Sequence, residues 1–292
     1  MPFTLAHPAF VLPLRHAPQL RAAPLIVGAM VPDLPYFLPG KFQRLIPETH
    51  DFLGSITTDL ALGYLALIVL LLLRRPLTAL LAPRARWLCL HSLAPFTHRS
   101  RAWLWAAPAL LLGIWSHLLW DSFTHTDGWV TRRVSALSAP MVIGPYTEPV
   151  AHVLQYLSSV VGLAVMVIWY LRLPAPARYP ADPHAARPPV APILMLSAAA
   201  AVLIGGVQAS EHYAHLHLFY YSMNVLLTRS CAWFCALYLV AGLVVSAEHP
   251  PDAPRAAGEA VLDGLGGSGD GGERTTRQEE AALGGETPPG RY

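Results

Sequence analysis

Long apolar runs, separated by polar or proline-rich stretches, organise most of the chain. Five runs are long enough for an α-helix to cross a bilayer; they occupy residues 53–73, 104–123, 151–173, 193–209 and 219–246. A sixth run, residues 22–38, is short for a crossing, and Pro32 and Pro35 interrupt its end. This run is predicted either to cross the membrane or to enter and leave it on the same side.

The segments between the runs are predicted to be short helices, connectors and linkers. Residues 1–21 contain four prolines and allow only a short helix that begins near Pro8. Residues 76–103 form a basic amphipathic connector, and residues 174–192 form a proline-rich linker. From residue 248 onward the chain is rich in Gly, Pro and charge, without apolar periodicity. We therefore expect a membrane helical domain, 1–247, and a disordered tail, 248–292.

Composition supports a membrane protein. The 292 residues are 54% hydrophobic and 13% charged, whereas soluble domains are about 25% charged. The expected fold is an all-α, polytopic membrane helix bundle of about five to six membrane segments. The net charge of +2 gives no indication of a nucleic-acid partner, and the three cysteines do not suggest a disulfide framework.

The distribution of basic residues predicts the orientation, because short cytoplasmic loops are enriched in Lys and Arg. If residues 22–38 end on the side of the membrane opposite to residue 21, the side of residue 21 collects eleven basic residues: Arg15, Arg21, six arginines of 74–101, Arg172, Arg178 and Arg187. The other side holds four, namely Lys41, Arg44, Arg132 and Arg133. Only one of the twenty basic residues is lysine, which suggests a GC-rich bacterial genome. We expect a multi-pass protein of the bacterial inner membrane with a cytoplasmic C-terminus.

Three ionisable residues fall on one face of the 104–123 helix and its end. His117, Asp121 and His125 are spaced by four residues, so each lies only about 40° round the helix from the last. Ionisable groups in membrane helices usually face a protein interior or a water-filled cavity. Imidazole and carboxylate are also zinc ligands. The alternative is a polar face that pairs with itself or caps the helix end, and His125 lies just past the apolar run.

Three further candidates lie at the extracytoplasmic ends of their segments, at the same membrane depth as His117, Asp121 and His125. Asp33 follows Pro32, His50 precedes the first long span, and His152 opens the 151–173 span. Each has a structural alternative. Asp33 would belong to a turn or cap a helix, His50 would be exposed beside a helix cap, and His152 would form a hydrogen bond to a neighbouring helix. His7 can meet Asp33 only if residues 8–38 form a helical hairpin. Another cluster, which we expect to be a solvated loop rather than a metal site or lid, comprises Glu211, His212, His215 and His217.

Four motifs, MPFTLAHPAFVLPL, VGAMVPDLPYFL, GIWSHLLWDSFTHTDGW and HVLQYLSSVVGL, resemble domain-of-unknown-function family 4184, a family of bacterial integral membrane proteins. The resemblance covers about residues 1 to 245. That family is distantly similar to membrane-bound metal-dependent hydrolases and zinc-dependent phospholipases C. The resemblance implies these metal ligands: His7, Asp33, His50, His117 and Asp121. His125 and His152 are added because of their position.

We therefore expect a metal-dependent hydrolase at the extracytoplasmic membrane surface, with zinc as cofactor and His117 and Asp121 as catalytic residues. Its substrate would be a phosphoester of a membrane lipid or lipid-linked compound. The surplus of ligands suits two metal ions, or one ion with further carboxylates that orient the imidazoles. The alternative is a non-catalytic transport or structural protein with a polar His/Asp core. Because the ionisable residues gather at one side, a surface site is favoured over a pathway across the membrane.

Overall fold

Membrane-length helices dominate the fold. The computed structural model describes residues 4–17, 20–38, 46, 48–144, 146–173, 190–216 and 219–248. All of them belong to one compact unit, Met1–His249. Most of the predicted linker, from residue 174 to 189, and the predicted disordered tail from residue 249 onward lie outside the described residues.

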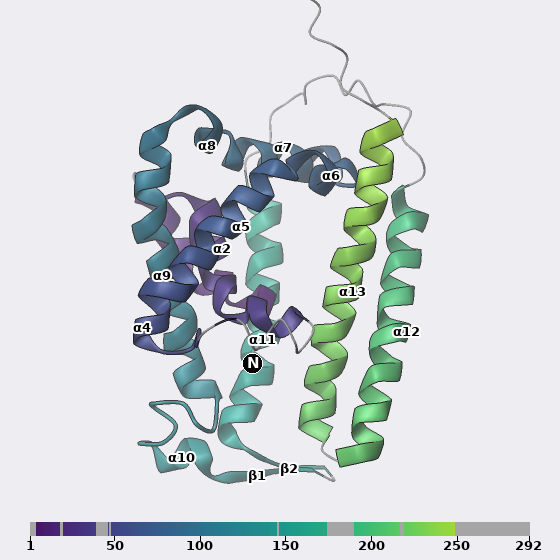
Figure 1. The fold of residues 1–292 in the computed structure, drawn as a ribbon. Coiled ribbons are helices and arrows are strands. Elements are labelled where there is room, and N and C mark those ends of the chain that lie inside the picture. Colours follow the sequence, from purple (N-terminus) through teal and green to yellow (C-terminus); the bar gives the residue numbers. More distant parts are fainter. Residues whose placement is uncertain are drawn as a thin grey trace, which may run out of the picture. The chain divides into compact units, whose positions relative to one another are not determined.

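Among the described residues, five helical segments are long and apolar enough to cross a membrane: Phe52–Leu72, Ser100–Thr124, Val150–Arg172, Val190–Glu211 and Ser222–Glu248. The first comprises α4 (Phe52–Gly54), the π-helical turn η4 (Ser55–Asp59) and α5 (Leu60–Leu72). The other four lie in α9 (Ser100–Thr124), α11 (Val150–Arg172), α12 (Val190–Leu216) and α13 (Phe219–Glu248). The prediction of a polytopic membrane helix bundle is confirmed (Figure 1).

The N-terminal residues form a helical hairpin. Its first arm contains η1 (Thr4–Ala6), α1 (Pro8–Val11) and η2 (Leu12–His16). Its second arm contains α2 (Ala22–Met30) and η3 (Val31–Phe37). The Thr4 hydroxyl donates to Asp33 Oδ2 at 2.7 Å, so the start of the first arm lies against the end of the second. The structure therefore has the helical hairpin that was one alternative for residues 8–38.

Helix α2 packs closely on α9 through small residues. A Cβ atom added at Gly113 would lie 2.5 Å from the Leu25 carbonyl oxygen and 2.6 Å from the Ala29 nitrogen. Small residues of this kind allow the backbones of membrane helices to approach each other. Leu25 and Ala29 are buried against Ala109 in the same interface. This packing places η3, which follows α2, beside the C-terminal turns of α9.

The two ends of the bundle carry different connecting structures (Figure 1). One end holds the basic connector, which forms α6 (Arg74–Ala79), α7 (Pro83–Leu93) and α8 (Pro95–His98). The other end holds α10 (Ser135–Ser138) and an antiparallel hairpin of β1 (Pro140–Ile143) and β2 (Tyr146–Pro149). Gly144 in the hairpin connection has a φ of +57°, which suits glycine. This small hairpin was not predicted, although it leaves the helical fold class unchanged.

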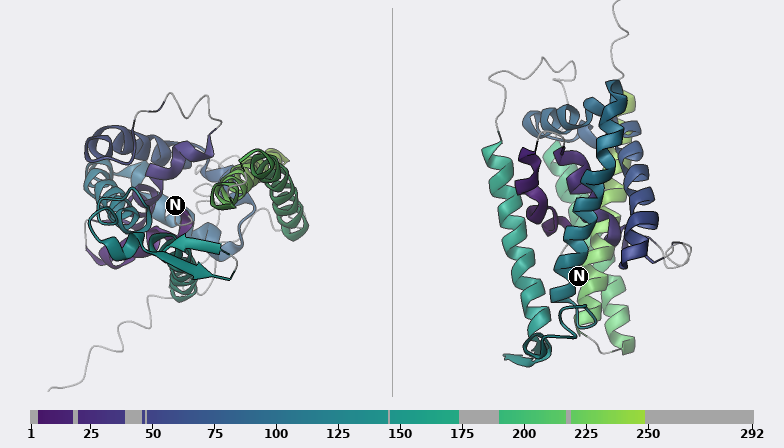
Figure 2. Two further views of the ribbon diagram at one scale, coloured as in Figure 1. Left: turned by 90° about the horizontal axis from the view of Figure 1, so that it is seen from below. Right: turned by 90° about the vertical axis from the view of Figure 1, so that its left-hand side faces the viewer.

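Helices α12 and α13 lie side by side along their length (Figures 1 and 2). Helix α13 also packs on the connector helix α6, where the Tyr238 hydroxyl donates to the Leu77 carbonyl at 2.7 Å. Near its other end, the Arg229 guanidinium donates to the Leu38 carbonyl at 3.3 Å. These contacts attach the helix pair to the rest of the bundle.

Candidate metal centre

Four ligand-type side chains from three segments converge at one point: Asp33, His50, His117 and Asp121. Asp33 lies in η3, His50 precedes α4, and the other two lie one turn apart in α9. One nitrogen or oxygen atom from each lies within 4.8 Å of the others. All except His50, which is half-buried, are buried. The structure therefore brings together four of the seven residues that the sequence predicted as ligands.

His117 turns its Nε2 atom toward the group. Its Nδ1 atom is 2.9 Å from the Ala29 carbonyl oxygen. Since a carbonyl can only accept, Nδ1 carries a proton, and in the neutral imidazole Nε2 then carries the lone pair. Nε2 lies 3.5 Å from Asp33 Oδ1 and 3.3 Å from Asp121 Oδ2. A lone pair therefore faces two carboxylate oxygens.

His50 is oriented in the same way by Thr49. The Thr49 hydroxyl donates to the Pro32 carbonyl at 3.1 Å, and its oxygen is 3.0 Å from His50 Nδ1. Because the hydroxyl has one proton to give, the Thr49 oxygen must accept from His50 Nδ1–H. In the neutral imidazole His50 Nε2 then carries the lone pair, and it lies 3.6 Å from Asp33 Oδ1 and 3.8 Å from Asp121 Oδ2.

The two carboxylates leave oxygen atoms without partners at the same point. Thr4 bonds Asp33 Oδ2, so Asp33 Oδ1 is the oxygen that faces the imidazoles. Four inward atoms are buried and have no hydrogen-bond partner among the described residues: His50 Nε2, His117 Nε2, Asp33 Oδ1 and Asp121 Oδ2. A buried polar atom left in this state costs about 1–3 kcal/mol, and more when it is charged. Facing lone pairs also repel one another unless a cation lies between them.

The separations fit a bound cation better than an internal ion pair. Tetrahedral ligand atoms 2.0–2.2 Å from zinc lie about 3.3–3.6 Å apart. The four measured imidazole-to-carboxylate separations run from 3.3 to 3.8 Å. If His117 were instead protonated at Nε2 and paired with an aspartate, an N–H···O distance of about 2.7–3.2 Å would be expected. The donor set of two imidazoles and two carboxylates therefore fits a divalent metal ion.

His7 packs against this group without joining it. Its ring stacks on the His117 ring with centroids 3.8 Å apart, and its Nε2 atom is 3.6 Å from Asp121 Oδ1. Burial lowers the pKa of His7 to about 3, although the carboxylates of Asp121 and Asp33 act to raise it. His7 is therefore a neutral imidazole beside the second oxygen of Asp121.

His125 and His152 also lie outside the four-residue group. His125 is the C-cap of α9; its backbone N–H donates to the Asp121 carbonyl at 3.0 Å, and burial lowers its pKa. Its Nδ1 atom is 3.7 Å from Asp121 Oδ2, so it lies at the edge of the group. His152 Nδ1 instead lies 2.7 Å from Glu148 Oε2, on strand β2. His152 therefore lies apart from the group and pairs with an acidic residue four positions earlier, and its role as a ligand stays a prediction.

Sequence reasoning missed several residues that shape this site. Thr4, Thr49 and the Ala29 carbonyl were not among the candidates, and the helix cap beside His50 was not assigned to a residue. The cap is Asp51, whose carboxylate accepts from the Gly54 backbone N–H. Asp59, in η4, is fully buried, and neither of its carboxylate oxygens has a hydrogen-bond partner among the described residues. A single aspartate within the 53–73 apolar run was the available signal.

A polar cavity of about 580 Å³ opens beside the group. Its lining includes Tyr36, His50, Asp121, His125, Trp129 and Arg132. His117 does not line it. Asp121 is therefore the predicted catalytic residue that a molecule in the cavity can contact, whereas His117 lies behind it.

The second histidine cluster was predicted to be a loop, but α12 continues to Leu216 and includes part of it. Glu211 is exposed at this end of the helix. The side chains of His212 and His215, and residue His217, lie outside the described part of the structure.

Comparison with known proteins identifies the family without a function. Residues 1–247 match the family model described as Domain of unknown function (DUF4184). The chain belongs to this family. No curated protein and no solved structure matches the chain. The DUF4184 region contains all four residues of the group and the N-terminal hairpin, while the resemblance to hydrolases gains no support from these comparisons.

Proposed function

We propose that this protein is a metal-dependent hydrolase of the bacterial inner membrane. Asp33, His50, His117 and Asp121 would bind a divalent ion, most simply zinc. The substrate would be a phosphoester in a membrane lipid or lipid-linked compound, reached from the extracytoplasmic side. The observation that carries the proposal is the convergence of four buried ligand atoms that have no hydrogen-bond partner in the described part of the chain.

The chain supplies a second layer of contacts that would hold these ligands. The Ala29 carbonyl fixes the His117 ring, and Thr49 fixes the His50 ring. Thr4 fixes one oxygen of Asp33. Outer contacts of this kind commonly change metal affinity by about 10- to 100-fold when removed. A bound zinc ion would lower the pKa of water to about 7 and polarise a phosphoryl oxygen.

Asp121 is the residue we expect to handle a proton during hydrolysis. It lines the polar cavity, and its Oδ1 atom faces His7 while Oδ2 faces His50 and His117. Both oxygens are buried beside the four-residue group, so Asp121 would accept a proton from a water held within that group. His117 has no contact with the cavity, so we assign it to ligand binding alone.

The polar cavity suits a phosphorylated headgroup. Arg132 contributes a cation to its lining, and guanidinium groups recognise phosphate oxygens well. Asp51, Asp121 and Asp127 in the same lining are acidic, so the attraction for an anionic headgroup rests on Arg132 and on the proposed metal ion. Trp129, also in the lining, is exposed and is the type of residue found at membrane–water interfaces. Together they support a substrate with an anionic headgroup at the membrane surface.

The first test is metal content. We expect protein purified in detergent to contain zinc or another divalent metal near one ion per chain by inductively coupled plasma mass spectrometry. His117→Ala and Asp121→Ala should lose it because each removes one of four ligands. His98→Ala, at an exposed position in α8, is the matched control and should keep it. Sub-stoichiometric metal that is unchanged by either ligand substitution contradicts the proposal.

The second test is turnover. Wild-type protein reconstituted with phospholipid should release a phosphorylated headgroup or phosphate. Asp121→Asn should lower that rate by about 100-fold or more, as expected when a general base is lost. If the protein binds metal but hydrolyses no phospholipid or lipid-linked phosphoester, the metal site stands and the hydrolase proposal is wrong.

One observation favours a second function, ion transport. Asp59 is a buried acidic residue with no partner among the described residues, about 10 Å further along its span than Phe52. A transport path would need such a group, although α5 beyond it, Leu60–Leu72, contains no charged residue. Zinc flux into proteoliposomes that is abolished by Asp59→Asn would favour transport over hydrolysis.

A further inference from the structure

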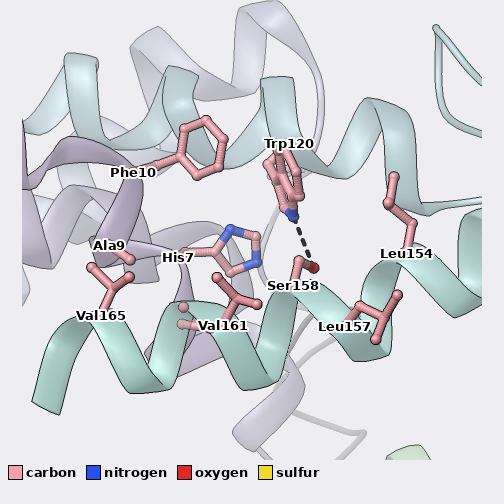
Figure 3. A pocket seen from close by; sticks show the side chains of 11 residues that line it. His7, Ala9, Phe10, Trp120, Leu154, Leu157, Ser158, Val161 and Val165 are labelled. Atoms are coloured by element: carbon pink, nitrogen blue, oxygen red, sulfur yellow. Dashed lines mark hydrogen bonds between the residues drawn. The ribbon is translucent and has the colours of Figure 1, made fainter.

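An apolar groove of about 510 Å³ lies between the N-terminal hairpin, α9 and α11 (Figure 3). Apolar side chains form most of its wall, among them Phe10, Trp120, Leu157, Val161 and Val165. Its polar side chains are His7 and Ser158. Trp120 Nε1–H donates to the Ser158 hydroxyl at 3.2 Å, and Ser158 donates to the Gln155 carbonyl at 3.0 Å. The groove therefore offers few unmet hydrogen bonds and suits a hydrocarbon ligand.

The groove opens on the surface that meets the bilayer. Leu157 and Val161 are 60% and 61% exposed on α11, which is one of the five membrane-length helices. Phe10 is exposed on the opposite wall. The volume lies within the range of about 300–1,000 Å³ found for small-molecule sites. Hydrocarbon from the membrane can thus enter without crossing water.

The groove reaches the candidate metal centre through His7. The His7 ring lies between Phe10 and Val161 in the groove (Figure 3). It also stacks on His117 and lies 3.6 Å from Asp121 Oδ1. Asp121 in turn lines the polar cavity. An apolar site and a polar site therefore adjoin the same four-residue group, as a molecule with a hydrocarbon chain and a polar headgroup requires.

The groove is held open by close packing at its base. A Cβ atom added at Gly162 would lie 2.8 Å from Ala6 Cβ, so η1 and α11 already touch there. The rings of Phe10 and Trp120 are 4.6 Å apart, and the bond from Trp120 to Ser158 fixes the other wall. A site that is formed before its ligand arrives loses less entropy on binding.

We propose that this groove binds one hydrocarbon chain of a membrane lipid whose headgroup occupies the polar cavity. The bond joining headgroup to lipid then lies beside Asp121 and the candidate metal centre. Cleavage of that bond rests on the proposed function, but binding of the chain does not.

Photoaffinity labelling tests the proposal. The probe is phosphatidic acid with a diazirine in one acyl chain, mixed into phosphatidylcholine vesicles that contain the protein. Mass spectrometry should locate the adducts at residues that line the groove, on α11 and near His7. Val161→Trp fills the groove and should lower labelling there about tenfold, equivalent to losing the burial of roughly two methylene groups.

The matched control is Val160→Trp on the same helix. Val160 is 69% exposed and does not line the groove, so labelling at the groove residues should be unchanged. Val165→Trp is a second groove variant, and monodisperse elution in detergent shows which variants fold. Equal labelling round α11, or labelling unaffected by both groove variants, would show only bilayer lipid against the helix and overturns the inference.

The two proposals fail separately. If the protein binds no metal but the groove is labelled and Val161→Trp prevents it, chain binding stands and the hydrolase proposal falls. If metal binds and lipid is hydrolysed but the groove variants label like wild type, the groove inference falls and the hydrolase proposal stands.

Discussion

Thr49 controls which nitrogen of His50 faces the two aspartates. Its hydroxyl donates to the Pro32 carbonyl and its oxygen accepts from His50 Nδ1–H. Thr49→Val keeps the side-chain shape but removes the acceptor, so the imidazole loses its fixed orientation. We expect the affinity for zinc to fall about 10- to 100-fold although no ligand is removed. Competition with a chelator of known affinity measures this change.

Two other substitutions separate orientation from general damage. Thr49→Ser keeps the hydroxyl and should retain the affinity of wild type. Thr57→Val removes a hydroxyl in η4 that donates to the Leu53 carbonyl, away from the group, and this variant should also bind normally. Wild-type affinity in Thr49→Val would show that His50 is oriented by something other than Thr49.

At the residue scale, the sequence predicted the candidate ligands better than the contacts that hold them. His117 and Asp121 could be predicted together because helical periodicity alone puts them on one face. The outer contacts join residues far apart in the chain: Thr4 and Asp33 are 29 positions apart, and Ala29 and His117 are 88 apart. His152 was assigned by membrane depth, which does not determine the direction in which a side chain points.

At the scale of elements, the five long spans could be predicted because length and apolar composition determine them. The N-terminal hairpin could only be left as an alternative, since prolines show where a helix ends but not where the chain turns. The contact between α2 and α9 depends on which faces the glycines occupy, and one sequence does not show that. The β1–β2 hairpin is too short to produce a clear alternating pattern.

The α2–α9 contact predicts that Gly113→Ala lowers stability, whereas helix propensity alone predicts that it raises stability. Alanine is favoured over glycine in helices by about 1 kcal/mol, so Gly113→Ala should strengthen α9 alone. Its Cβ would instead meet the Leu25 carbonyl oxygen at 2.5 Å and move α2 away. We expect a loss of about 1–3 kcal/mol of stability from overpacking. Zinc content should fall too, because Ala29 and Asp33 move with α2. Thermal unfolding in detergent and metal analysis measure both effects.

Gly206 on α12 provides the matched control. A Cβ atom there would meet no atom within 4 Å, so Gly206→Ala should leave metal content unchanged and stability equal or higher. If both alanine variants behave alike, the close contact between α2 and α9 does not hold the metal centre in place.

At the scale of the whole bundle, the structure separates the basic connector from the candidate site. Arg84 on α7 donates to the carbonyl oxygens of Tyr170, Leu171 and Leu173, at the C-terminal end of α11. The four-residue group instead lies at the C-terminal end of α9, whose next residues lead into the cavity lining and the β1–β2 hairpin. This arrangement supports the orientation that we propose from the basic residues, with the site outside and the connector in the cytoplasm.

Cysteine labelling tests that orientation directly. Val142 on β1 is 75% exposed at the end we propose to be extracytoplasmic, and the native Cys89 is exposed on α7 at the other end. With Cys231 and Cys235 replaced by serine, a membrane-impermeant maleimide should label Val142→Cys in intact spheroplasts. Cys89 should react only after the membrane is permeabilised. The reverse pattern would turn the polar cavity toward the cytoplasm, and the substrate would then have to be a lipid headgroup of the inner leaflet.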